Sequence, residues 1–189
     1  MVDAACARLC YSGGAEQLAS RNGETRMRRL YLAVSLAALL LPPTLARAET
    51  PEAIAVKGQN LIATAHAEGA QVYECKADAS GKLAWSFREP IASLMIDGKT
   101  VGRHYAGPTW EMADGSAVVG KAAGRAPGAS AQDIPLLKLE AASQRGSGQL
   151  AGVATIQRLN TRGGVAEGAC ERAGAFLSVP YAADYAFYR

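Results

Sequence analysis

The chain has 189 residues and a formal net charge of +3, from 20 basic and 17 acidic side chains. Six of the basic and three of the acidic residues precede Glu49, so residues 49–189 carry 14 of each and are neutral. A neutral chain without a basic cluster lacks the electrostatic footprint of a nucleic-acid-binding domain and the polybasic patch that binds anionic lipid. We therefore expect neither nucleic acid nor a membrane surface as a partner.

Residues 27–48 have the three parts of a secretory signal peptide. Two arginines follow Met27, the apolar run Leu30–Leu41 comes next, and a small-residue A-x-A triplet ends at Ala48. The apolar run is shorter than the roughly 20 residues that cross a bilayer. We expect cleavage after Ala48, no membrane span afterwards, and export to the periplasm or out of the cell. We interpret residues 1–26 as an upstream segment produced by a start-site error, with an unusually long signal-peptide n-region as the alternative.

The expected mature chain, residues 49–189, has the length of one domain that can bury its own core. Of the 4 cysteines, only Cys75 and Cys170 lie in it. In an oxidising compartment an isolated pair is most simply one disulfide, which here would close a loop of roughly 96 residues. A reactive thiol or redox pair is the alternative, but no C-x-x-C motif supports it.

Turn signals at fairly even spacing predict a series of β-hairpins. They lie at residues 78–82, 97–98, 114–115 and 146–148, and two of them are Asp-Gly pairs that suit tight hairpin turns. Between the turns apolar and polar residues alternate, as strands require. Segments with this pattern are 72–75, 82–88, 137–141 and 150–157. In the last of them Thr155 and Gln157 form the polar face. The aromatic-rich segment 179–188 is also predicted to be extended.

These features predict an all-β fold, a single antiparallel sandwich or barrel domain built from hairpins after a cleaved signal peptide. One weak helical pattern covers Glu52–Ala65. Two irregular segments interrupt the strands, and we expect Ala122–Asp133 to be a surface loop. We expect Thr161–Ser178 to be a second loop, which a Cys75–Cys170 bridge would order against the first strands.

Several motifs in combination resemble the DUF3455 family of exported bacterial and fungal proteins. They are GAQVYEC at residues 69–75, GRHYAGPTWE at 102–111, DGS at 114–116 followed by VGK at 119–121, IQR at 156–158, TRGG at 161–164, Cys170 and VPYAADY at 179–185. The resemblance spans nearly all of residues 49–189 and implies a single exported domain with paired cysteines. It assigns no catalytic residue, because the family has no established biochemical function to carry over.

The segment 102–111 is the strongest candidate for a functional site. Aromatic faces combined with a few charged groups are typical of a pocket for a small molecule or a glycan. The candidate ligand-binding residues are Arg103, His104, Tyr105, Trp110 and Glu111. The alternative is that Tyr105 and Trp110 are core residues beside the Gly107-Pro108 bend, while Arg103 and Glu111 form a surface pair.

Catalytic and metal sites have weaker support in the sequence. A zinc site needs three or four ligands, and a hydrolase needs a nucleophile, a base and an orienting acid. The candidate metal ligands are His66, His104, Glu68, Glu111 and Asp114, and the candidate triad is Ser116, His104 and Asp114. The segment 115–122 resembles a phosphate-binding loop, but Ala122 stands where magnesium requires Ser or Thr.

We therefore expect a non-catalytic exported β-domain without metal or cofactor that binds a small molecule, a glycan or an envelope component. Two alternatives stay open at this point. One is a hydrolytic or metal-dependent enzyme that uses His104, and the other is a structural envelope protein without a ligand.

Overall fold

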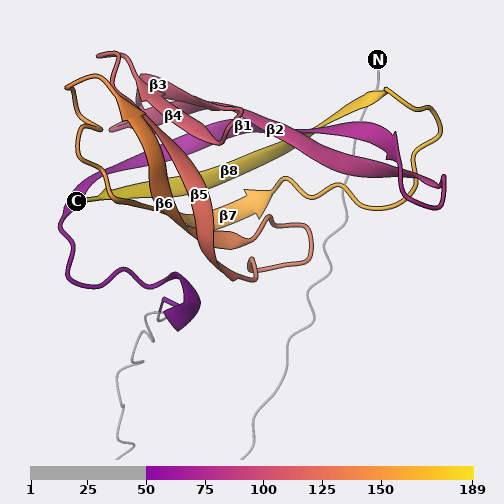
Figure 1. Cartoon of the computed structure of the whole chain (residues 1–189), viewed down its shortest axis with the longest axis horizontal. Helices are drawn as coiled ribbons and strands as arrows, with labels where there is room; N and C mark the ends of the chain where they lie inside the picture. Colours follow the sequence, from indigo (N-terminus) through magenta and orange to yellow (C-terminus); the bar gives the residue numbers. More distant parts are fainter. Residues whose placement is uncertain (1–49) are drawn as a thin grey trace, which may run out of the picture. The chain divides into compact units, whose positions relative to one another are not determined.

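A computed structural model describes residues 50–189, so the expected upstream segment 1–26 and signal peptide 27–48 lie outside the described residues. Eight antiparallel strands follow one another around a closed barrel, in which β8 pairs with β1 (Figure 1). The predicted all-β fold is confirmed, and its form is a barrel. The strands are β1 (Leu61–Ala77), β2 (Leu83–Ile96), β3 (Lys99–Tyr105), β4 (Thr109–Met112), β5 (Ala117–Ala126), β6 (Leu136–Arg145), β7 (Thr155–Gly163) and β8 (Phe176–Tyr188).

The predicted turns all connect consecutive strands. Asp97 and Gly98 join β2 to β3 with φ values of 51° and 72°, and positive φ at both central residues is what the tightest hairpin turns require. In the turn between β1 and β2, Asp78 Oδ1 accepts hydrogen bonds from the amides of Ser80 and Lys82 at 2.8 and 3.0 Å. Local turn chemistry therefore accounts for where these strands end.

Large aromatic side chains fill the middle of the barrel and share one buried cluster with small side chains of neighbouring strands. Trp110 of β4 contacts the rings of Tyr185 and Phe187 of β8, at centroid distances of 5.1 and 6.2 Å. Alanines of β1 and β2 belong to the same buried cluster. Gly120 of β5 is needed beside the indole, because a Cβ there would lie 2.9 Å from Trp110 Cζ3.

One end of the barrel is closed by the connection between β6 and β7. Leu150 and Val153 in this connection are fully buried. The Leu150 amide donates a hydrogen bond to Ser116 Oγ at 3.1 Å, and the Gln149 amide donates to Asp114 Oδ2 at 2.7 Å. Both bonds join the β6–β7 connection, which we call the plug, to the β4–β5 turn.

The segment before β1 covers part of the outer face of the barrel. We expected Thr155 and Gln157 on a polar face, but both are buried. Gln157 lies under the segment that precedes β1, where its Nε2 donates to the Ile54 carbonyl at 2.6 Å. The weak helical pattern at 52–65 is wrong: Glu52–Ile54 form a single 3-10 turn and β1 begins at Leu61. Within residues 50–189 no helix is long and apolar enough to cross a membrane.

Both irregular segments are shorter than predicted. The expected surface loop Ala122–Asp133 is wrong over its first part, because β5 continues to Ala126, which pairs with Leu136 of β6. The second segment starts later than expected, since β7 continues to Gly163, and it ends at Phe176 where β8 begins. In both places backbone pairing with a neighbouring strand outweighs the local Gly and Ala content.

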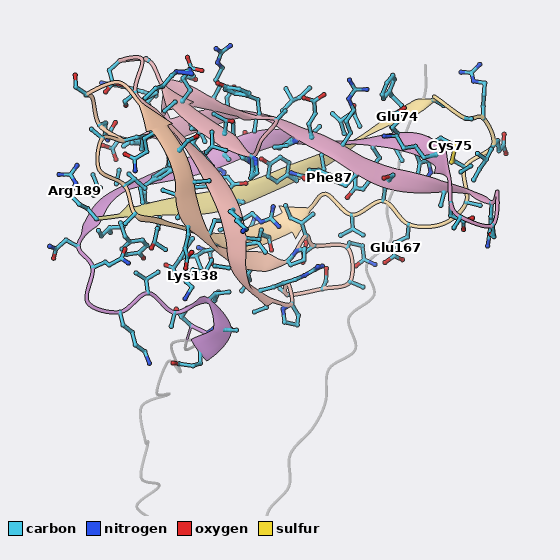
Figure 2. The ribbon with its side chains drawn as sticks, viewed as in Figure 1. Glu74, Cys75, Phe87, Lys138, Glu167 and Arg189 are labelled. Carbon is cyan, nitrogen blue, oxygen red and sulfur yellow. A yellow bond between two sulfur atoms is a disulfide. The ribbon has the colours of Figure 1, made fainter. Side chains whose placement is uncertain are left out.

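The predicted disulfide between Cys75 and Cys170 is confirmed, with the two Cα atoms 5.8 Å apart. It joins the β7–β8 loop to the part of the β1–β2 ribbon that is remote from Arg189 (Figure 2). Backbone hydrogen bonds from Cys75 N to Ala175 O and from Gly174 N to Cys75 O reinforce the contact, at 2.8 and 2.9 Å. The predicted ordering of this loop by the bridge is therefore observed.

Reduction of this bridge should lower the melting temperature by roughly 8–20 °C. A loop of this length contributes about 4–5 kcal/mol in the chain-entropy treatment, and each kcal/mol corresponds to roughly 2–4 °C for a domain of this size. Differential scanning calorimetry with and without reductant measures the shift. A variant with Cys75→Ala and Cys170→Ala is the control, and its melting curve should not respond to reductant; a wild-type curve that does not respond either would contradict the prediction.

Candidate functional site

A cavity of about 900 Å³ lies at the end of the barrel opposite the β6–β7 plug. The β3–β4 turn and the neighbouring parts of β1, β2, β5, β6 and β7 surround it. Its wall is mainly apolar, with Tyr73, Phe87, Pro90, Ile134, Leu137 and Leu139 among the lining residues. Pockets for small molecules usually measure roughly 300–1,000 Å³ and have walls of this kind.

Strand alternation determines which side chains reach the cavity. On β1, Gln71 and Tyr73 share the inward face with Cys75. On β7, Arg158 lies two residues after the fully buried Ile156 and therefore points to the same side. Tyr73 is held in place by its hydroxyl, which donates to the Gly164 carbonyl at 2.6 Å.

Arg158 brings an uncompensated positive charge to this apolar space. Its Nε donates to the Pro135 carbonyl at 2.9 Å, and none of the ion pairs within residues 50–189 includes it. Arg125 lines the cavity as well, without an ion pair in the same part of the chain, whereas Arg88 pairs with Glu74 and Glu89. A charge beside an apolar wall is costly unless an opposite charge approaches it.

Three buried polar groups beside Arg158 have no hydrogen-bond partner among the described residues. They are the Gln71 side-chain amide nitrogen and the hydroxyls of Tyr181 and Tyr185. Burial raises the pKa of both tyrosines, and the charge of Arg158, which is the cross-strand partner of Tyr185, acts in the opposite direction on each. Buried polar groups are nearly always paired in folded proteins, so a cluster of unpaired donors needs an explanation.

His104 lies between this cluster and the aromatic core. Its ring stacks on Trp110 with centroids 4.5 Å apart, and its Nδ1 is 2.8 Å from the Thr109 carbonyl oxygen. A carbonyl oxygen only accepts, so Nδ1 carries the proton. Burial, with a smaller contribution from the positive charge of Arg158, lowers the pKa of His104 to about 3. The ring is therefore neutral at pH 7.

The five residues predicted as a ligand site lie on both faces of the β3–β4 hairpin. His104 pairs with Trp110 and Arg103 pairs with Glu111, so the first pair points inward and the second outward. Of the five, His104 alone lines the cavity, while Trp110 lies beneath it with 1 % of its surface exposed. Tyr105 joins the outward group.

The outward group is a network around one carboxylate. Glu111 Oε2 accepts hydrogen bonds from Tyr105 Oη at 2.7 Å and from Arg103 Nη2 at 3.0 Å, and Arg145 Nη2 lies 2.7 Å from it. These three donors lower the pKa of Glu111 to about 2. Because its three partners come from β3 and β6, the Glu111 carboxylate crosslinks these strands to β4 on the outer face.

The residues considered for catalysis do not come together. Ser116 Oγ donates to Asp114 Oδ1 at 2.6 Å within the β4–β5 turn, whereas His104 is bonded to Thr109. His66 lies on the outer face, with Nδ1 2.7 Å from Asp184 Oδ1. Among residues 50–189, no group of three His, Cys, Asp or Glu side chains is arranged to hold a metal ion.

The DUF3455 family model, described as a protein of unknown function, matches residues 56–189. The chain belongs to the DUF3455 family. The match includes all eight strands, the cavity and both bridged cysteines, so this DUF3455 domain is the whole barrel. No curated protein and no solved structure matches the chain.

Two polar residues of the cavity were not among the predicted site residues of this DUF3455 domain. Gln71 and Arg158 are polar side chains at inward positions of strands whose neighbouring inward positions are Tyr73 and Ile156. A polar residue that interrupts the apolar face of a strand is the signal that could have identified both. Hydrophobic patterning does not indicate whether such a residue is solvated, paired inside the protein or available to a ligand.

The buried His104 should make the fold less stable as the pH falls. The unfolded chain binds a proton near pH 6.5, whereas the folded ring stays neutral to about pH 3, so stability is lost as the pH drops below 6.5. The loss attributable to this group is about 2 kcal/mol at pH 5. Urea unfolding at pH 7 and pH 5 should therefore show a smaller acid-induced loss for His104→Gln than for the wild type.

His66 is the matched control, because its pKa is raised, chiefly by the hydrogen bond to Asp184. Its contribution to stability is complete below pH 6.5 and is lost as the pH rises through its folded pKa. His66→Gln should therefore not reduce the acid-induced loss. A His104→Gln variant with the wild-type pH dependence would contradict the assignment of a neutral, buried ring.

Proposed function

We propose that this DUF3455 domain is a non-catalytic binding protein that holds one small molecule inside the open end of its barrel. The observation that supports this is the combination of a large apolar cavity with an unpaired arginine and an unpartnered amide, Arg158 and Gln71. Binding sites of small molecules combine an apolar wall with a few convergent polar groups in this way.

The number of strands supports the same proposal. An eight-stranded barrel has an interior that is either just filled by side chains or able to hold one small ligand. In this barrel the plugged end is filled, whereas the other end has about 900 Å³ that no side chain occupies. A purely structural envelope protein would gain nothing from such a space, since filling it with apolar side chains would add stability.

A small molecule is better supported than a glycan. The aromatic residue predicted to bind a sugar ring, Trp110, is 1 % exposed and covered by His104 and Tyr185, and Phe87 is the accessible aromatic ring at a cavity whose wall is mainly apolar. An enzyme that uses His104 has less support than a binding protein, because the ring has neither a nucleophile nor a carboxylate among its hydrogen-bond partners within residues 50–189.

We infer that the protein works outside the cytoplasm, in the periplasm or beyond the cell. The features that support this are the signal-peptide pattern of residues 27–48 and the bridge between Cys75 and Cys170, since disulfides persist in oxidising compartments. The neutral charge of residues 49–189 supports the expectation that neither nucleic acid nor an anionic membrane is its partner.

Blocking the cavity should abolish binding of a neutral apolar probe. Ala122 of β5 pairs with the inward-facing Leu139 and lines the cavity, so Ala122→Phe would place a phenyl ring in the space. We expect wild-type protein to bind the fluorescent probe prodan saturably at one molecule per barrel. Ala122→Phe should weaken this binding at least tenfold, as measured by fluorescence titration.

Ala142→Phe is the matched control, because Ala142 is an exposed residue of β6 that does not line the cavity. It should bind prodan like the wild type, and circular dichroism should show that both variants are folded. Equal binding by the Ala122→Phe variant, or no saturable binding by the wild type, would overturn the proposed function.

A further inference from the structure

The charge inside the cavity identifies the chemical class of the ligand. We propose that the ligand is an amphiphilic carboxylate, with its carboxylate bound by Arg158 and Gln71 and its apolar body along the cavity wall. This inference rests on the proposed function and adds to it the charge and the orientation of the bound molecule.

Arg158 is the half-buried arginine of the cavity, whereas Arg88 and Arg125 are exposed. Its Nε donates to the Pro135 carbonyl, and its polar neighbour inside the barrel is the Tyr185 hydroxyl, so no described carboxylate balances its charge. The lining residues include Arg88 and Arg125 but no Asp or Glu. A cationic ligand would meet only like charges there, and a neutral one would leave the Arg158 charge uncompensated next to apolar groups.

Gln71 supplies a second donor for the same anion. It is 2 % exposed, it lines the cavity, and its Nε2 donates to no acceptor within the described part of the chain. The Tyr181 and Tyr185 hydroxyls lie close to Gln71 and to each other without well-formed hydrogen bonds, and they add two O–H donors to the cluster. A carboxylate has about four acceptor sites and no donors, and a guanidinium binds it with two parallel hydrogen bonds. It therefore matches a cluster that contains mainly donors.

The apolar wall excludes a bare inorganic anion as the preferred ligand. Ile134, Leu137 and Leu139 line the cavity together with Tyr73 and its cross-strand partner Phe87 (labelled in Figure 2), whose ring lies 5.7 Å from that of Tyr73 and has 53 % of its surface exposed. An anion without a hydrophobic body would leave these groups in contact with water. An apolar body would bury them, at roughly 25 cal/mol for each Å² removed from water.

A matched ligand series tests the charge. Naphthoate, naphthamide and naphthylmethylammonium share one aromatic body, and dodecanoate, dodecanamide and dodecylammonium share one aliphatic body. We expect calorimetry at pH 7 to show that the carboxylate with the preferred body binds at least tenfold more tightly than its amide, with no measurable binding of its ammonium. Comparison of the naphthyl series with the dodecyl series shows whether the ligand is an aromatic acid or a fatty acid.

Arg158→Met tests the assigned residue. It should weaken carboxylate binding at least tenfold, because hydrogen bonds to charged groups contribute about 1.5–3 kcal/mol, while amide binding should change less than threefold. Arg162→Met is the matched control, since Arg162 is an exposed residue of the same strand that does not line this cavity. It should bind the carboxylate like the wild type.

Gln71→Met keeps the inference testable if Arg158→Met does not fold, and it should weaken carboxylate binding by threefold or more. Equal affinities for carboxylate and amide, or full carboxylate binding by the Arg158 and Gln71 variants, would overturn the carboxylate assignment. In that case the proposed function would still stand if the wild type binds prodan and the Ala122→Phe variant does not. Failure of prodan and of every member of both series to bind would overturn both.

Discussion

The pairing of β8 with β1 is the constraint on which the rest of the barrel depends. It connects Leu61 with Tyr188 at one end and Glu74 with Phe176 at the other, so the first and last strands share a long antiparallel ladder. Once the sheet is closed, each strand has one face inside and one outside, and the inward set is fixed for all eight strands together. The cavity, the core and the outer networks all follow from this assignment.

The two ends of the barrel use the inward positions differently. Towards the plug these positions hold Phe187, Leu94 and Met112, and the β6–β7 connection adds Leu150, so packing is complete. Towards the open end Gln71, His104 and Arg158 take their place, and apolar residues continue only on the wall formed by the other strands. Polar side chains at inward positions reduce the stability of the domain, and in our proposal they supply the hydrogen bonds that hold the ligand.

Much of the fold could be predicted from local chemistry. Asp97-Gly98 and Asp114-Gly115 mark turns, residues 137–141 alternate as a half-buried strand, and Cys75 pairs with Cys170. The site could be predicted only in part, because alternation divides Arg103 and Glu111 from His104 and Trp110 without indicating which pair faces inward. That choice depends on barrel closure, which involves strands more than 70 residues apart in the sequence. The burial of Gln157 depends likewise on a distant segment, residues 50–60.

The ribbon formed by β1 and β2 has a consequence for aggregation. β2 pairs with β3 only from Ala92 onward, so its first half has a backbone edge that another β-strand could join, next to the exposed Ile91. Pro90 has no amide hydrogen, which interrupts the row of donors along that edge. Farther along, a bridge between Ala84 and Ala169 covers the edge, and the neighbouring cysteine bond keeps this cover attached. The crosslink therefore also protects the protein from joining its neighbours edge to edge.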